Sequence, residues 1–158
     1  MTAPVPLRFT LNARSQTIEV PTSRVLSDLL TETFGLHGAR VACGRGLCGA
    51  CTVLVDGEPR AACSTFAWEV EGAIVETIEG LGGASPVQAA FAAVSAFQCG
   101  YCTPGMILLA TALLRADPDP CRATVRDWLS SNLCRCTGYA VIEEAVLAAA
   151  AAIRAARA

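Results

Sequence analysis

The sequence predicts an α+β protein, because strand-forming and helix-forming patterns occupy separate halves of the chain. In the first half, apolar and polar residues alternate over 7–12 and 16–20, as half-buried strands require. In the second half this alternation disappears and alanine dominates. The glycine-rich segment 80–86 separates the two patterns and is typical of a linker. We therefore expect one unit over 1–80 and a second over 81–158.

The first unit is predicted to be a small mixed sheet packed on one helix. Turn-forming residues join the first two alternating segments into a hairpin, and Asp56 and Gly57 form a tight turn in a second hairpin. Leucines and a valine at helical spacing follow the first hairpin, with Gly35 as the helix stop. The expected elements are strands at 7–12, 16–20, 52–55, 60–64 and 73–78, and a helix over 25–30.

The second unit is predicted to contain four helices, with one cysteine pair between the first two and another between the last two. Thr103 and Pro104 open the second helix, and Thr137 is expected to cap the fourth, since threonine favours the N-cap and proline the first turn. Two helix amino termini would then face one site, which favours negative charge there. The expected helices cover 86–96, 104–115, 121–132 and 139–157.

Composition limits the possible partners and compartments. The net charge is −2 without a basic block, which argues against a nucleic-acid partner. The longest aliphatic run, 106–114, is too short to span a membrane, and no secretory signal begins the chain. Nine cysteines without a signal favour metal ligation in a reducing compartment. We expect a cytoplasmic protein, or a periplasmic one if a signal-bearing partner carries it across the membrane.

The first group of cysteines has the spacing of a plant-type [2Fe–2S] site. Four residues separate the first two cysteines, two separate the next pair, and the fourth lies on the expected return strand. Gly44, Gly46 and Gly49 alternate with them, as a loop that turns backbone N–H groups toward sulfur requires. Zinc is the alternative, although zinc sites usually combine two short knuckles. The ligands would be Cys43, Cys48, Cys51 and Cys63.

The second group joins one cysteine pair to a distant one, and its spacing alone leaves both iron–sulfur and zinc open. Its members are Cys99, Cys102, Cys134 and Cys136. Cys121 has no partner by spacing, and His37, the only histidine, is expected to have no metal role because a Rieske-type centre needs two. No nucleophile–base set or phosphate-binding glycine loop is present, so we expect no catalytic residue in this chain.

Three motifs resemble those of the small iron–sulfur subunits of molybdenum hydroxylases, the xanthine dehydrogenase, aldehyde oxidoreductase and isoquinoline or nicotinate dehydrogenase types. The motifs are Cys43–Val53, Gln98–Met106 and Asn132–Tyr139, and the resemblance covers nearly the whole chain. It implies an amino-terminal β-grasp ferredoxin-like domain and a carboxy-terminal four-helix domain, each with one [2Fe–2S] cluster. It also implies that Gln98 and Cys136 lie beside a molybdopterin cofactor held by a large partner subunit.

The resemblance implies electron transfer from that cofactor, through both clusters, to a flavin subunit, a cytochrome or another acceptor. The reaction served would be hydroxylation of an aldehyde or N-heterocycle, with the substrate pocket in the partner. Two alternatives remain open at this point. A free two-cluster ferredoxin predicts a stable monomer, and a redox- or iron-sensing module needs an exposed thiol, for which Cys121 is the only candidate.

Overall fold

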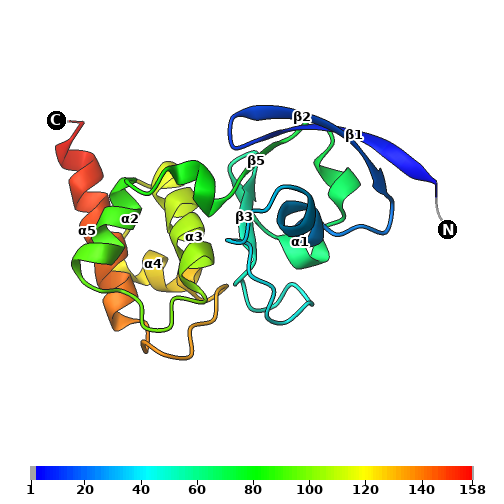
Figure 1. The fold of residues 1–158 in the computed structure, drawn as a ribbon. Coiled ribbons are helices and arrows are strands. Elements are labelled where there is room, and N and C mark those ends of the chain that lie inside the picture. The colour runs from blue at the N-terminus through cyan, green and yellow to red at the C-terminus, as the bar shows by residue number, and fades with distance from the viewer. Residues whose placement is uncertain (1–2, 158) are drawn as a thin grey trace.

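The computed structural model describes residues 3–157 and shows an amino-terminal lobe built on a sheet beside a carboxy-terminal lobe of helices (Figure 1). The sheet has five strands in the order β2-β1-β5-β3-β4. Only β1 and β5 pair in parallel; the other neighbours are antiparallel. The strands are β1 (Pro4–Leu11), β2 (Arg14–Pro21), β3 (Thr52–Val55), β4 (Glu58–Ala61) and β5 (Ile74–Glu76). The α+β class expected from the sequence is confirmed.

The predicted helix near residues 25–30 forms, but it changes its pitch partway. A single turn, α1 (Leu26–Asp28), continues into the wider π-helical turn η1 (Leu29–Thr33). Leu26, Leu29 and Leu30 are all buried against the sheet, so the apolar spacing that predicted the helix also fixes the face it buries. The stop at Gly35 is confirmed: its φ is +65° and its N–H donates to the Thr31 carbonyl.

The strand predicted over 60–64 is partly wrong. β4 ends at Ala61, and the chain turns through the 3₁₀ helix η2 (Ala62–Ser64), so Cys63 lies on a turn and not on a strand. The hydroxyls of Ser64 and Thr65 both donate to the Ala61 carbonyl, which replaces the strand ladder with a local turn. Two further 3₁₀ helices are η3 (Ala67–Val70) and η4 (Ile78–Leu81).

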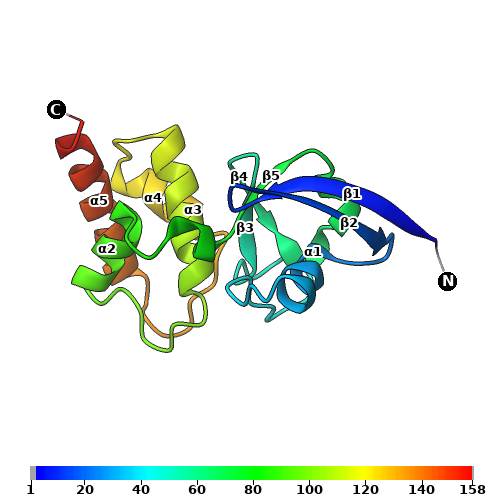
Figure 2. The same cartoon turned by 45° about the horizontal axis from the view of Figure 1, so that its top comes forward.

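All four predicted helices of the second lobe are present, with shorter ends in three of them. They are α2 (Pro86–Ala93), α3 (Thr103–Ala116), α4 (Arg122–Leu129) and α5 (Ala140–Ala155). Ser85 and Gln88 form a capping box at the start of α2. Every residue of α3 from Gly105 to Leu114 is buried, because this helix has the other helices on one side and the sheet on the other (Figures 1 and 2).

The two lobes share a contact surface where α3 lies against β3 (Figure 2). Leu54 of β3 packs against Leu108 and Ala112 of α3, and all three side chains are buried. At the edge of this contact both guanidinium NH₂ groups of Arg115 donate to Glu76 of β5, at 2.6 and 2.9 Å. This ion pair lowers the pKa of Glu76. Within residues 3–157 no helix combines the length and apolar character needed to cross a membrane.

Candidate metal centres

The first candidate centre lies between the loop that follows η1 and the end of the β3–β4 hairpin. Cys51 immediately precedes β3 and Cys63 follows β4, so the antiparallel pairing of these strands brings the two side chains together. The N–H of Cys63 points at the Cys51 sulfur at 3.5 Å. Cys43 and Cys48 contact each other in the loop. The structure therefore brings together all four cysteines predicted for the first site, in two pairs.

Backbone N–H groups point at the sulfurs of this centre. Arg45 N lies 3.4 Å from the Cys43 sulfur, and Gly46 N lies 3.3 Å from the Cys63 sulfur. Gly44, Gly46 and Gly49 all have positive φ, the conformation predicted for them from the sequence. Hydrogen bonds of this kind stabilise thiolates and tune the potential of a bound cluster.

The same geometry shifts the pKa of the half-buried Cys43 and that of the buried Cys51 in opposite directions. The Arg45 amide, followed by other backbone groups, lowers the pKa of Cys43 to about 6. Burial raises the pKa of Cys51 to about 11. A metal ligand must be deprotonated. Cys43 is therefore available as a thiolate at neutral pH, whereas Cys51 becomes one when a positive metal offsets the cost of burial.

The second candidate centre is formed by two loops at one end of the helical lobe. The loop between α2 and α3 carries Cys99 and Cys102, and the loop between α4 and α5 carries Cys134 and Cys136. The sulfurs of Cys99 and Cys136 lie 3.6 Å apart, and Cys102 contacts Cys134. The predicted second set is thus also assembled in two pairs.

Burial and hydrogen bonding again separate the thiols of this set. Burial raises the pKa of Cys102 to about 12, whereas the Tyr101 N–H lowers the pKa of Cys99. Thr137 does not cap α5, so that prediction is wrong. Its hydroxyl lies 3.1 Å from the Cys134 sulfur and accepts the N–H of Tyr139, the residue that precedes the helix with a φ of +70°.

The pairwise arrangement fits a binuclear cluster. Two thiolates on one tetrahedral metal ion, with bonds of about 2.3 Å, lie about 3.7 Å apart, close to the 3.6 Å between Cys99 and Cys136. A [2Fe–2S] cluster takes four cysteines, two on each iron. Among the described residues, no group of three or more Cys, His, Asp or Glu side chains converges on one ion. The donor set and its pairing therefore suit two [2Fe–2S] clusters, one in each lobe.

The remaining candidates are placed as follows. Gln98 is exposed and its amide donates to the Cys136 carbonyl at 3.2 Å, so these two predicted cofactor-contacting residues lie together. Cys121 is exposed before α4, and its sulfur contacts the Thr124 hydroxyl, which lowers the pKa of that thiol. His37 is exposed and lies in neither cysteine set.

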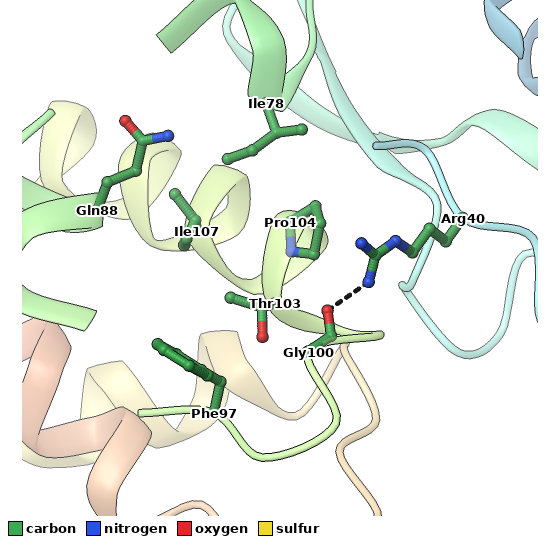
Figure 3. Close-up of a pocket in the computed structure, with 8 residues that line it drawn as sticks. All are labelled: Arg40, Ile78, Gln88, Phe97, Gly100, Thr103, Pro104 and Ile107. Atoms are coloured by element: carbon green, nitrogen blue, oxygen red, sulfur yellow. Dashed lines mark hydrogen bonds between the residues drawn. The ribbon is translucent and has the colours of Figure 1, made fainter. Parts of the chain in front are cut away.

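Three residues around the sites were given no role from the sequence. Tyr139 accepts the N–H of Cys134 and donates to the Asn132 carbonyl, closing the loop that carries the second cysteine pair. Arg40 reaches from the first lobe to the Gly100 carbonyl, beside a pocket of about 250 Å³ (Figure 3). Asn132 is fully buried between the lobes. Asn132 and Tyr139 are the first and last residues of the third motif, but its spacing alone gives no sign of a contact between lobes.

Two family models match the chain: a 2Fe-2S iron-sulfur cluster binding domain over residues 16–89 and a [2Fe-2S] binding domain over 77–147. The protein is thus a carrier of two [2Fe–2S] clusters. It is 47% identical over 135 residues to a probable xanthine dehydrogenase subunit of Bacillus subtilis, covering 84% of this chain and 78% of that one. It is 43% identical over 154 residues to the nicotine 6-hydroxylase small subunit of Paenarthrobacter nicotinovorans, covering 93% of each.

The fold is also shared with solved structures. A chain of quinoline 2-oxidoreductase from Pseudomonas putida 86 superposes with a TM-score of 0.92 at 38% identity, covering 99% of this chain and all of that one. The protein belongs to the family of small iron–sulfur subunits of the molybdenum hydroxylases. In that family it is the electron-transfer part of an oxidoreductase.

Proposed function

We propose that the two cysteine sets are the ligands of the two clusters and that electrons enter at the helical lobe and leave from the sheet lobe. The observation that carries the assignment is the pairing of the thiols, which supplies two sulfurs for each iron of each cluster. The amino-terminal ligands are Cys43, Cys48, Cys51 and Cys63, and the carboxy-terminal ligands are Cys99, Cys102, Cys134 and Cys136.

The direction of electron flow is supported by exposure. Cys99 and Cys136 are exposed beside Gln98, so a partner that covers this face reaches the helical site directly. The proposed partner is a large subunit whose molybdopterin cofactor contacts Gln98 and Cys136 without being held by this chain. The relatives are named for xanthine, nicotine, nicotinate and aldehydes, which supports a substrate that is an N-heterocycle or an aldehyde.

The outward acceptor is proposed to be a flavin subunit, a cytochrome or another redox partner that approaches the sheet lobe. Each bound cluster supplies a one-electron redox centre. The chain's own residues hold the sulfurs, direct the N–H groups of Arg45, Gly46 and Cys63 toward them, and keep Cys51 and Cys63 away from water. These groups set how easily an electron is accepted at each site.

The division of the chain is proposed to follow the two cores. A β-grasp ferredoxin-like domain would cover 1–80 and a four-helix domain 81–158. In support of this division, the apolar residues form one buried cluster around the sheet and another among the helices. We propose a cytoplasmic location, with a periplasmic one if a signal-bearing partner exports the folded complex.

The test is elemental analysis of the gently purified native complex, with iron, sulfide, zinc and molybdenum measured per copy of this chain. The proposal predicts iron and sulfide for two [2Fe–2S] clusters, with molybdenum in the same particle. Full iron loading without molybdenum or a partner would identify a free two-cluster ferredoxin instead. One zinc in place of one cluster would contradict the assignment of the helical site.

A further inference from the structure

The loops that carry the two cysteine sets touch each other directly. The N–H of Leu133 donates to the Cys48 carbonyl at 2.8 Å, and the side-chain amide of Asn132 donates to the Gly49 carbonyl at 3.1 Å. Two consecutive residues of the second loop thus bind two consecutive carbonyls of the first. Leu133 is covalently joined to Cys134, so one hydrogen bond links the backbone next to a ligand in one site to the backbone of a ligand in the other.

We propose that the Leu133–Cys48 hydrogen bond is the electronic bridge between the two cluster sites and that Asn132 is the positioning residue that maintains it. This inference rests on the proposed ligand assignment. One electron leaves the helical site, which is oxidised, and arrives at the amino-terminal site, which is reduced. No covalent bond forms or breaks and no proton moves in this step.

Asn132 is held from both sides, as a positioning residue must be. Its side chain is 0% exposed and its amide nitrogen is bound to Gly49, while its own carbonyl accepts the Tyr139 hydroxyl at 2.9 Å. The same hydroxyl accepts the Cys134 N–H at 2.8 Å. The loop from Asn132 to Tyr139 is therefore closed on itself, and the buried Asn132 amide and the Leu133 N–H attach it to the sheet lobe.

Two glycines allow the approach. A Cβ on Gly49 would lie 2.7 Å from the Ser131 carbonyl oxygen and 2.8 Å from the Asn132 Cα, and Gly49 has a φ of +69°. A Cβ on Gly105 would meet the Gly49 carbonyl and lie 2.8 Å from the Asn132 amide nitrogen. A side chain at either position would push the ligand loops apart, so the backbones pack as closely as the chain permits.

The second connection between the loops is less direct. Tyr101 donates its hydroxyl to the Val41 carbonyl at 2.9 Å, and the Arg40 guanidinium lies over the Tyr101 ring. The same guanidinium donates to the Gly100 carbonyl (Figure 3). A route here would cross the whole tyrosine side chain and the residues between Val41 and Cys43. The Arg40 contact thus holds the lobes together, and the shorter path lies through Leu133.

The test compares Asn132→Ala with Ser131→Ala, an exposed neighbour whose hydroxyl bonds only within its own turn. Each variant is purified as the native complex, and both clusters are counted by iron content and by electron paramagnetic resonance. The rate at which a single electron redistributes between the clusters is then followed by rapid freezing after partial reduction. A second pair, Gly49→Ala and Gly72→Ala, shares a positive φ, but only the Gly49 Cβ meets the other loop, and Gly72 lies outside both ligand loops.

We expect full loading of both clusters in Asn132→Ala, with inter-cluster transfer slowed about 10-fold or more, the scale on which outer-shell partners of metal sites act. Gly49→Ala should be slowed as well, while Ser131→Ala and Gly72→Ala keep the wild-type rate. An unchanged rate in Asn132→Ala and Gly49→Ala would overturn the bridge. Loss of a cluster in Asn132→Ala would show an assembly role instead, and wild-type protein without two clusters would refute the ligand assignment itself.

Discussion

Replacing Gly105 with alanine sets helix propensity against the packing of the two lobes. Gly105 lies in the first turn of α3 and is buried. Alanine is more favourable than glycine within a helix by up to about 1 kcal/mol. On that basis alone, Gly105→Ala would raise the free energy of unfolding.

The contacts of the added methyl group predict the opposite sign. It would meet the Gly49 carbonyl and lie 2.8 Å from the Asn132 amide nitrogen. The first is main chain of the sheet lobe and the second belongs to a fully buried side chain of the helical lobe, so neither moves away without a change in the surrounding packing. Overpacking of this kind costs about 1–3 kcal/mol. After the gain in helix propensity, the expected net loss is about 1 kcal/mol, or a Tm lower by about 2–4 °C.

The assay is urea and thermal unfolding of the cluster-loaded chain. Gly105→Ala, Asn132→Ala and the variant that carries both substitutions form a double-mutant cycle with the wild type. Asn132→Ala removes one of the two close contacts of the new methyl group, so the double variant should lose less than the sum of the single losses. A coupling of about 0.5 kcal/mol or more is expected for groups in contact. A Tm above that of the wild type, or additive losses, would show that Gly105 does not pack as described.

Other variants test the ligand assignment and the lobe contact. Cys102→Ser should abolish the spectrum of the helical cluster and leave that of the amino-terminal cluster; loss of both spectra would mean that the sites assemble together. Cys121→Ala should leave the iron per chain unchanged, and a decrease would contradict the ligand sets. Glu76→Gln should lower the free energy of unfolding by about 0.5–1 kcal/mol at pH 7, because it breaks the ion pair with Arg115. The ion pair lowers the pKa of Glu76 below its ordinary 4.5. In urea unfolding, the difference in free energy between Glu76→Gln and wild type should therefore persist above pH 4.5 and vanish as the pH falls through the lowered pKa. A difference that did not change with pH would refute the electrostatic explanation.

The sequence predicted the helices and strands well where a pattern has a single local cause, and the structure brings the cysteines of each predicted set together. Alternating residues located the strands, and Gly35 ended its helix as expected. The prediction was wrong where side chains compete with the backbone for hydrogen bonds. Ser64 and Thr65 turn the chain at Cys63, and Thr137 binds within its own loop instead of capping α5.

Contacts between the lobes could not be predicted from local patterns. Asn132 binds Gly49, which is far away in the sequence, and its neighbours alone suggest only a helix end. In the sequence, Gly105 is only a residue of low helix propensity. The structure gives the reason for it, because a Cβ there would meet the Gly49 carbonyl. Such positions depend on the three-dimensional approach of two segments, for which a single sequence carries no periodic signal.

The order of the strands has a consequence for synthesis. β5 lies between β1 and β3 in the sheet, yet it is the last strand to leave the ribosome. Until residues 74–76 emerge, the hairpins on either side have no common neighbour, and such long-range pairing forms late. All four cysteines of the first set have emerged by then. The thiols of the first set therefore leave the ribosome before the sheet can close beside them.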